Sequence, residues 1–460
     1  MTAPEPEAQS VQPCEGDYPA SVQTLIIGGG ACGLIAALQA KETGQEVLIL
    51  ERDAVPSGST ALSAGLVPAA GTALQRAAGI EDDPAVFAAD IQKKAKNEND
   101  PDLVALLANG AAGVIDWLVD RHDMPFSVVA DFDYPGHSRR RMHGLPTRSG
   151  RELVDSLRAR AEASGIDILC DARATVLYMR GAQVGGVGIA RPDGTMERIG
   201  CDRLILACNG FGGNRDMVRE LLPGISNAVW FGHDGNTGDA IRWGREIGAE
   251  LDHLGAYQGH GNVAHPHGIL ITWATMTEGG FQVNRAGARF WNETRGYSEA
   301  ARVVLAQPDG EAISVFDARI ASIARQFADF REAEAQGAVV VADSFEEIQA
   351  QFALPAGALQ RAHDGLHAAA QDSFGRPRPE RPLTPPYAAV RVTGALFHTQ
   401  GGLCVDATAR VRRASGERFD NLFAGGGAAC GVSGRSDAGY LSGNGLLAAC
   451  VLGFIAGQSD

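Results

Sequence analysis

Apolar and polar positions follow strand and helix patterns from Val22 onward. Residues 22–51 contain a short apolar strand, a glycine turn, an amphipathic helix and a second apolar strand that ends at Glu51. Residues 202–210 and 421–431 are further apolar runs that end in glycine. In a doubly wound sheet such loops gather at the carboxyl edge, where ligands bind. The pattern therefore predicts an α/β fold built on buried strands.

The pattern changes within residues 256–385, which contain short mixed runs and a charged, helical stretch at about 320–336. We expect this segment to form an inserted α+β domain. Residues 21–255 and 386–460 then form the first and second parts of the surrounding domain. Residues 1–20 are rich in Pro, Glu and Gln without periodicity, which predicts a mobile lead.

Composition narrows the class of protein. Hydrophobic residues make up 45% and charged residues 21% of the 460 residues, as in folded globular chains. The net charge of −15 disfavours nucleic acid as a partner. The first residues lack a basic and apolar leader, and residues 446–457 are too short to span a bilayer, so we expect a cytoplasmic protein without a membrane contact. The eight cysteines show no metal-binding spacing, and no metal is expected.

A glycine fingerprint predicts a dinucleotide site. Gly28, Gly30 and Gly33 form GxGxxG between the first strand and its helix, and Glu51 closes the next strand. Gly28 permits the turn, Gly30 lets the backbone approach a pyrophosphate, and Gly33 lets helix and strand pack closely. Glu51 would accept hydrogen bonds from a ribose. FAD and NAD share this turn, but the Ser/Thr/Gly loop at residues 57–66 could wrap a second nucleotide moiety, which favours FAD.

Several further blocks carry a family resemblance. They are SGSTALSAG (57–65), ACNGFGGN (207–214), DGNTGDAIRWGREIGA (234–249), VNRAGARFWNE (283–293), HTQGGL (398–403) and LSGNGLL (441–447). In these blocks and their order the chain resembles the succinate dehydrogenase and fumarate reductase flavoprotein family. The resemblance implies a Rossmann-like (GR2-type) FAD-binding domain with an inserted α+β capping domain that closes over the isoalloxazine. Where respiratory members carry a histidine bonded to the flavin, this chain has Ser59, which implies noncovalent FAD.

The motifs and the resemblance together give a set of expected FAD-binding residues. These are Gly28, Gly30, Ala31, Gly33, Glu51, Arg52, Ser59, Thr60, Ser63, Gly65, Asn209, Gly210, Asp239, Gly425, Gly426, Gly443, Asn444 and Leu446.

The substrate site departs from the family pattern. In the soluble fumarate reductases two arginines and two histidines surround a dicarboxylate. The resemblance places His398 and His260 on the histidines, with His265 and His267 as a shifted alternative to His260. The two arginine positions are instead occupied by tyrosines.

These tyrosines are Tyr297 and Tyr440, and the family's proton-relay Glu and Arg positions hold Trp273 and Met276. An enclosed carboxylate that loses a charged partner costs roughly 3 kcal/mol or more, about a hundredfold in binding. A dicarboxylate substrate is therefore disfavoured, although an arginine could restore one contact. The candidates for that contact are Arg289, Arg295 and Arg435.

The pattern Tyr440, Leu441, Ser442 together with Tyr297 is similar to that of the 3-ketosteroid Δ4-dehydrogenases in the family. By that similarity, Tyr440 and a backbone N–H such as that of Gly445 would hold a ketone, as donors do in an oxyanion hole. Ser442 and Tyr297 would relay the α proton while the flavin takes hydride from the β carbon.

We therefore expect an FAD-dependent enzyme that desaturates, or reversibly reduces, the carbon–carbon bond next to a carbonyl in a neutral cyclic or steroid-like ketone or enone. The expected catalytic residues are Tyr297, Tyr440, Ser442, His398 and His260. Electrons would pass to or from a separate acceptor or donor. The alternatives are a fumarate reductase-like enzyme for an unsaturated carboxylate and a noncatalytic flavin-binding protein.

Overall fold

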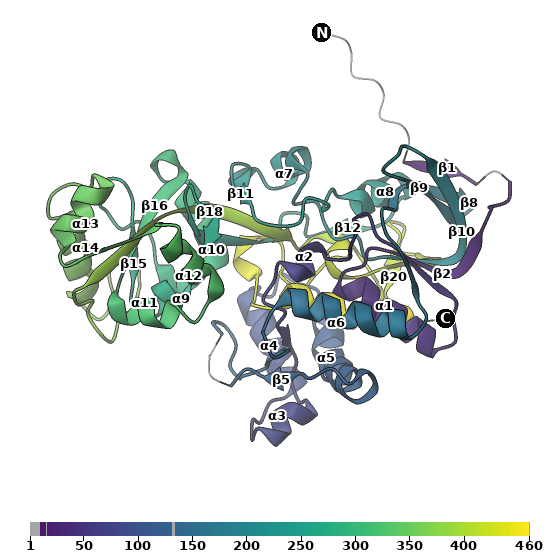
Figure 1. The fold of residues 1–460 in the computed structure, drawn as a ribbon, viewed down its shortest axis with the longest axis horizontal. Coiled ribbons are helices and arrows are strands. Elements are labelled where there is room, and N and C mark those ends of the chain that lie inside the picture. The colour runs from purple at the N-terminus through teal and green to yellow at the C-terminus, as the bar shows by residue number, and fades with distance from the viewer. Residues whose placement is uncertain (1–9, 15, 131–133, 460) are drawn as a thin grey trace, which may run out of the picture. The chain divides into compact units, whose positions relative to one another are not determined.

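The computed structural model describes residues 10–14, 16–130 and 134–459. Within these residues the chain divides into two compact units (Figure 1). The first unit comprises Met1–Leu221, Gly232–Tyr257 and His398–Asp460, and the second comprises Leu222–Phe231 and Gln258–Phe397. The domain boundaries expected at residues 255/256 and 385/386 remain predictions.

The first unit is built on a mixed sheet with strand order β1-β8-β9-β10-β2-β3-β7, to which β21 and β20 add beside β10. The strands are β1 (Val11–Pro13), β2 (Ser21–Ile27), β3 (Val47–Leu50), β7 (Asp167–Leu169), β8 (Arg173–Arg180), β9 (Gln183–Ala190), β10 (Met196–Leu206), β20 (Arg410–Arg412) and β21 (Arg418–Ala424). β10, β2, β3 and β7 run parallel, and β21 is parallel to β10. The expected Rossmann-like α/β class is confirmed.

Helices and short strands complete this unit. The helices are α1 (Ala31–Glu42), α2 (Gly58–Ala61), α3 (Ala73–Ala77), α4 (Pro84–Lys94), α5 (Pro101–His122), α6 (Gly150–Ala163), α7 (Arg215–Leu221), α8 (Asp239–Ile247) and α15 (Asn444–Gln458). The short strands are β4 (Val67–Pro68), β5 (Ser127–Val128), β6 (Met142–Gly144), β12 (Leu251–Asp252) and β19 (Gly402–Leu403). By length and composition α5 could cross a bilayer, a test that core helices also pass, and its buried residues belong to the core of this unit.

Helix α1 is not amphipathic as expected, because it is buried from Ala31 to Ala40. Besides the sheet, it packs against α15 and α6. A methyl group on Gly453 of α15 would lie 2.5 Å from the Cys32 carbonyl oxygen, and one on Gly457 would lie 2.3 Å from that of Ala36. The two helices therefore approach backbone to backbone, which only glycine allows.

Part of the expected mobile lead is a strand. Residues 1–9 and 15 lie outside the described residues, but β1 pairs in parallel with β8. The Ser10 hydroxyl donates to the Glu246 carboxylate, and the Val11 N–H donates to the same side chain at 3.1 Å. Partners distant in the chain hold this strand in place. Its three residues therefore need no alternation of apolar and polar positions, and the sequence shows none.

The second unit is an α+β arrangement on a sheet of order β14-β13-β18-β16-β15, with β11 and β17 also paired to β18. The strands are β11 (Val229–Trp230), β13 (Tyr257–Ala264), β14 (Ile269–Leu270), β15 (Phe281–Val283), β16 (Glu311–Asp317), β17 (Val339–Ala342) and β18 (Tyr387–Thr399). The helices are α9 (Ala274–Thr277), α10 (Tyr297–Leu305), α11 (Ala318–Ala324), α12 (Ala328–Ala335), α13 (Phe345–Phe352) and α14 (Ala358–His367). The single helix expected near residues 320–336 is thus divided into α11 and α12.

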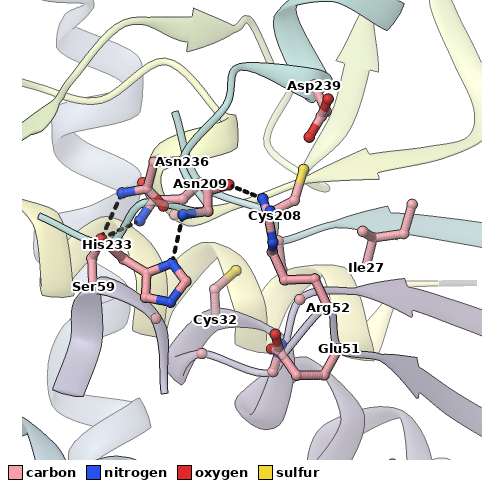
Figure 2. Close-up of a pocket in the computed structure, with 18 of the residues that line it drawn as sticks. Ile27, Cys32, Glu51, Arg52, Ser59, Cys208, Asn209, His233, Asn236 and Asp239 are labelled. Atoms are coloured by element: carbon pink, nitrogen blue, oxygen red, sulfur yellow. Dashed lines mark hydrogen bonds between the residues drawn. The ribbon is translucent and has the colours of Figure 1, made fainter. Parts of the chain in front are cut away.

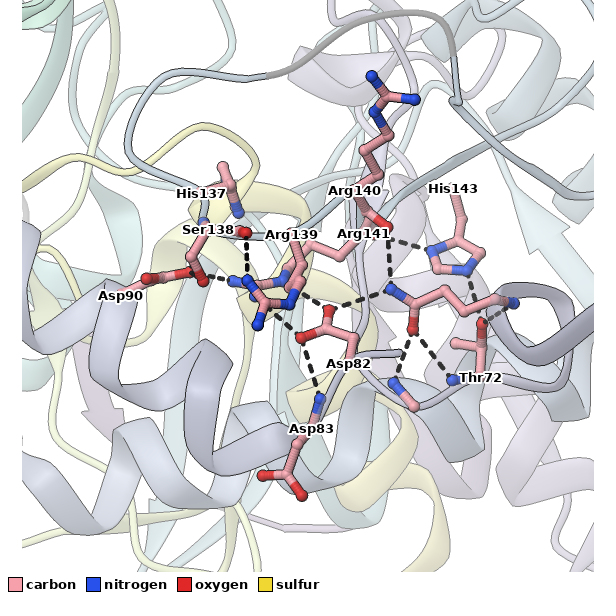
Figure 3. Close-up of polar contacts among 12 residues, drawn as sticks. Thr72, Asp82, Asp83, Asp90, His137, Ser138, Arg139, Arg140, Arg141 and His143 are labelled. Carbon is pink, nitrogen blue, oxygen red and sulfur yellow. Dashed lines mark hydrogen bonds and ion pairs between the residues drawn. The ribbon is translucent and has the colours of Figure 1, made fainter. Parts of the chain in front are cut away.

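A buried ion-pair network links the hairpin before β6 to α4 in the first unit (Figure 3). Arg141 donates to Asp82 from Nε at 2.9 Å and from Nη2 at 3.0 Å, and to Asp90 from Nη1 at 2.6 Å. The side chains of Arg141 and Asp82 are 0% exposed. The guanidinium carbon also lies 4.6 Å from the ring centroid of Phe87, a cation–π contact. One guanidinium thus pairs with both carboxylates, which also accept hydrogen bonds from Gln75 and Ser138.

We expect Arg141→Met to lower the free energy of unfolding by about 3–5 kcal/mol, because it leaves buried carboxylate charge without its cation. Denaturant unfolding followed by circular dichroism measures the change. Arg139→Met is the matched control, since Arg139 lies in the same hairpin but is exposed, and its effect should stay within about 0.5 kcal/mol. Equal stability of the two variants would contradict the network's role.

Candidate functional site

An open cavity of about 810 Å³ lies in the first unit, at the carboxyl ends of β2, β3 and β10 (Figure 2). The glycine turn after β2, the first residues of β8 and the loop before α8 also line it. This is the edge at which open α/β sheets bind ligands.

The glycine turn has the geometry of a phosphate-binding loop. Gly28 has a φ of +109°, and a methyl group on Gly33 would lie 1.9 Å from the Gly28 carbonyl oxygen. Gly30 is extended and directly precedes α1, so the helix N-terminus faces the cavity. Unpaired N–H groups and the helix dipole at such a terminus favour a phosphate.

Glu51 lies at the end of β3 and is 6% exposed. Its Oε2 accepts a hydrogen bond from the Gly29 N–H at 2.8 Å, and its Oε1 accepts one from the Asp53 N–H at 3.0 Å. Burial raises the pKa of this carboxyl above its ordinary value, and the two backbone hydrogen bonds oppose the rise. The carboxylate is thus fixed beside the glycine turn, where a ribose would meet it.

Neutral side chains form the opposite part of the cavity (Figure 2). The Ser59 hydroxyl accepts hydrogen bonds from the Asn209 amide at 2.9 Å and the Asn236 amide at 2.8 Å. The Thr60 hydroxyl accepts one from the Ala31 N–H at 3.2 Å. Helix α2 is thereby tied to the start of α1, to the loop after β10 and to the loop before α8.

The structure brings together many of the expected cofactor residues. Those that line the cavity are Gly28, Gly30, Ala31, Glu51, Arg52, Ser59, Thr60, Asn209, Asp239 and Gly426. The remaining expected residues, all of them described, are outside its lining: Gly33, Ser63, Gly65, Gly210, Gly425, Gly443, Asn444 and Leu446. Two of these residues support the lining without being part of it. The Ser63 hydroxyl donates a hydrogen bond to the Thr60 carbonyl oxygen at 2.7 Å, and Gly33 packs against the Gly28 carbonyl group of the turn.

Other lining residues were missed by the sequence analysis. They include Cys32, Ala172, Arg173, Ala174, Cys208, His233, Gly235, Asn236, Trp243 and Gly427. The block at residues 234–249 contains three of them and the block at 207–214 contains Cys208, so these blocks could have indicated four of the residues, whereas the start of β8 carries no motif. His233 is held in place by Asp53, whose Oδ2 lies 2.7 Å from Nε2.

Two of the expected catalytic residues of the first unit lie just before α15. Tyr440 and Ser442 are 6% and 7% exposed. Burial raises the pKa of the Tyr440 phenol above its ordinary value, and hydrogen bonds from the backbone N–H groups of Gly445 and Gly443 oppose the rise. The phenol oxygen therefore lies at the N-terminus of α15, where backbone N–H groups point out of the helix.

His398 packs edge-on against Tyr440, with ring centroids 5.5 Å apart, and leaves no room for a methyl group on Gly445. The Gln400 amide donates to His398 Nδ1 at 2.8 Å, while its oxygen accepts from the Ser433 hydroxyl at 2.8 Å. The Thr399 carbonyl oxygen lies 3.2 Å from the same Nδ1, so the two contacts require opposite tautomers of the neutral ring. Burial lowers the pKa of His398 to about 4.

The expected residues of the second unit form an aromatic stack. His260 lies nearly parallel to Tyr297, with centroids 5.1 Å apart, and to Phe397 at 5.5 Å. Burial lowers the pKa of His260 to about 3, so the ring is neutral. His265 instead pairs with Glu311 at 3.3 Å and is outside this stack. The structure thus brings His260 and Tyr297 together.

The positions of the family's charged proton relay are apolar here. Trp273 and Met276 form a buried cluster with Trp291, and Tyr297 packs against it. Among the arginines that could restore a carboxylate contact, Arg289 is engaged by Glu293 and Asp372. Both carboxylates lie in the second unit, so the Arg289 guanidinium is already paired there.

We expect the free energy of unfolding to fall as the pH is lowered from about 6.5 to about 4. An unfolded histidine takes up a proton near pH 6.5, whereas burial keeps His398 and His260 neutral in the folded chain down to about 4 and about 3. Each histidine should therefore contribute a loss of about 1.4 kcal/mol per pH unit in this window. Denaturant unfolding at constant ionic strength measures the slope, which His398→Gln should reduce. An unchanged slope in that variant would contradict the assignment.

Comparison with known proteins agrees with this site. A family model described as FAD binding domain matches residues 23–446. Probable fumarate reductase Ifc3 of Shewanella frigidimarina (strain NCIMB 400) is 30% identical over 450 residues, which cover 95% of this chain and 74% of that protein. The open conformation of a flavocytochrome c3 fumarate reductase is 28% identical, with a TM-score of 0.82 over 96% of this chain and 78% of that one.

A further solved structure, 3-ketosteroid-Δ4-(5α)-dehydrogenase from Rhodococcus jostii RHA1 in complex with 4-androstene-3,17-dione, is similar in fold. Its sequence identity is 24% and its TM-score 0.76, over 96% of this chain and 97% of that one.

The glycine turn, the fixed Glu51 and the cavity that they line are those of a flavoprotein. The chain belongs to the FAD-binding domain family whose members include the fumarate reductases, and the expected family is confirmed. FAD is its cofactor, and the protein is an FAD-dependent oxidoreductase that acts on CH–CH groups.

Proposed function

We propose that this enzyme desaturates, or reversibly reduces, the bond α,β to the carbonyl of a neutral cyclic or steroid-like ketone. The observation that supports this most is the Tyr440 phenol on the backbone N–H groups of Gly445 and Gly443, beside neutral His398. A ketone oxygen bound there would meet the phenol O–H as its donor, because the N–H groups of Gly445 and Gly443 already donate to the phenol oxygen. These two hydrogen bonds make the phenol a stronger donor, which stabilises the negative charge that develops when the α carbon loses its proton.

Bound noncovalently, as Ser59 suggests, FAD would accept hydride from the β carbon in desaturation or donate it in reduction. In desaturation the α proton would leave through the Ser442 hydroxyl to water, the C=C bond would form, and two electrons would leave the substrate with the hydride. The relay role expected of Tyr297 stays a prediction. The rings that stack with Tyr297 are apolar or neutral, which suits an uncharged substrate. We further propose a separate electron acceptor or donor and a cytoplasmic location.

A carboxylate substrate is the second candidate, because Ifc3 is named a probable fumarate reductase. The neutral tyrosines at both arginine positions count against it, as does the engagement of Arg289 by two carboxylates. Losing one charged partner of an enclosed carboxylate costs about a hundredfold in binding.

Anaerobic flavin spectroscopy distinguishes these candidates. The photoreduced holoenzyme is mixed with 4-androstene-3,17-dione or with fumarate, and the oxidised holoenzyme with the corresponding saturated ketone. Reoxidation by the enone, or bleaching by the saturated ketone, supports the proposal, whereas reoxidation by fumarate alone supports the carboxylate reductase. No response to any ketone or to fumarate would contradict both candidates. Release of FAD into the supernatant after acid precipitation tests the noncovalent attachment.

A further inference from the structure

His137 contacts the turn that carries two of the expected catalytic hydroxyls, although it belongs to none of the sequence motifs. Its Nε2 lies 2.9 Å from the backbone carbonyl oxygen of Ser442, within the first unit. This is a direct hydrogen bond between the hairpin before β6 and the residue next to the N-terminus of α15.

The imidazole is held in a single orientation. Its ring lies 6.0 Å from that of Phe87 at an interplanar angle of 32°. The next residue, Ser138, donates to Asp90 from both its N–H and its hydroxyl at 2.8 Å, and Arg141 donates to the same carboxylate oxygen (Figure 3). The ion-pair network described above therefore anchors the backbone on which His137 sits.

The neutral form of His137 is the one that fits this contact. Burial lowers the pKa of His137 to about 4, and the hydrogen bond to Ser442 opposes the change. A neutral imidazole has one N–H, and a carbonyl oxygen accepts only from that nitrogen, so the proton is on Nε2. Nδ1 is buried with no hydrogen-bond partner in the described part of the chain. The ring is thus a fixed donor to the turn.

The turn is packed tightly on both sides. A methyl group on Gly136 would lie 2.7 Å from Leu441 Cδ1, and one on Gly443 would lie 2.7 Å from Pro68. Gly443 itself has a φ of +88°, which a residue with a side chain rarely adopts. Packing therefore resists small movements of residues 440–443, and the hydrogen bond from His137 holds the Ser442 carbonyl group in one orientation.

We infer that His137 is a positioning residue, which holds the Tyr440–Ser442 turn so that both hydroxyls face the carbonyl and the α carbon of the substrate. The inference rests on the proposed function. A misplacement of about 1 Å in a catalytic group can cost on the order of a hundredfold in rate, so loss of this donor should appear mainly in kcat.

His137→Phe keeps a ring against Phe87 and removes the donor, whereas His137→Gln keeps an N–H that can reach the Ser442 carbonyl. With 4-androstene-3,17-dione as the probe, we expect kcat to fall by about 10- to 100-fold in His137→Phe with KM changed less than about threefold, and to return to within about threefold in His137→Gln. An unchanged kcat in His137→Phe, or a His137→Gln variant equally slow, would overturn the inference. If His137→Phe does not fold, His137→Asn takes its place, because its shorter amide cannot reach the carbonyl.

His143 provides the matched control. It is buried in the same hairpin, burial lowers its pKa to about 4 as well, and it bonds to Thr72 and to the Arg141 carbonyl instead of the turn. His143→Gln should lower the melting temperature without the selective loss of kcat. The same loss of kcat in that variant would show that any disturbance of the hairpin is sufficient, and would overturn the specific role of His137.

Hydrogen exchange separates this inference from the proposed function, because it requires no substrate. Amides of residues 440–446 should exchange about tenfold faster in the His137→Phe holoenzyme than in the wild type and near the wild-type rate in His137→Gln. Unchanged exchange overturns the inference. If exchange responds as expected but no ketone alters the flavin spectrum of the wild-type enzyme, the positioning of the turn stands and the proposed function fails.

Discussion

Tyr440→Phe is expected to retain FAD and to lose turnover of a ketone by about 10²- to 10³-fold. The phenol is the side-chain donor of the proposed oxyanion site, and removal of one such donor typically has this effect on kcat. The ring itself stays, so its packing against His398 and the fold of the turn should persist. Flavin absorbance per protein measures FAD content, and stopped-flow bleaching of the flavin measures the chemical step.

Tyr178→Phe is the matched control for this variant. Tyr178 lies on β8 of the same unit, away from the α15 turn, and packs against Tyr18 and Arg198. Loss of the Tyr178 hydroxyl should change the turnover rate by less than about twofold and the free energy of unfolding by less than about 0.5 kcal/mol. Full activity of Tyr440→Phe would refute the assigned role, and loss of FAD from it would show that the residue is structural.

Gly33→Ala is expected to weaken FAD binding by about 100-fold, equivalent to about 3 kcal/mol. The added methyl group would lie 1.9 Å from the Gly28 carbonyl oxygen, and neither backbone can move without separating β2 from α1. The turn would open at the point where a pyrophosphate must approach the backbone. Titration of the apoprotein with FAD, followed by flavin fluorescence, measures the loss.

Gly113→Ala provides the corresponding control inside α5. A methyl group there would meet nothing within 4 Å, and the helical backbone accommodates alanine. This variant should bind FAD normally and be more stable by about 0.5–1 kcal/mol. If Gly33→Ala also retained normal FAD affinity, the close approach of turn and helix would not be required for the cofactor.

The nucleotide-binding turn could be predicted because its determinants are local. One continuous segment contains the buried strand, the glycine spacing and Glu51. In the structure this segment forms β2, α1 and β3, in the order that the sequence predicts. Even there the burial of α1 was misread, because the helix that covers its other face comes from the far end of the chain. A periodicity in one segment carries no information about a second partner that packs on it.

Long-range pairing explains most of what the sequence did not show. β1 is three residues long and depends on β8 and Glu246, while β11 pairs with β18 outside its own segment. His137 is a comparable case at the site, since its role follows from a hydrogen bond to Ser442 that no spacing encodes. Residues that act through tertiary contacts carry no motif, whereas glycines in a tight turn do.

The lining of the FAD cavity extends from Ile27 to Ala449 along the chain. The chain must therefore be synthesised as far as Ala449 before all the residues that line the cavity can come together. Until then the early β2–α1–β3 segment lacks the helix α15 that covers α1, and the nucleotide site is incomplete. We therefore expect FAD to bind late in synthesis of the chain, which cell-free translation with FAD in excess would reveal as a lag between synthesis of α15 and acquisition of yellow colour.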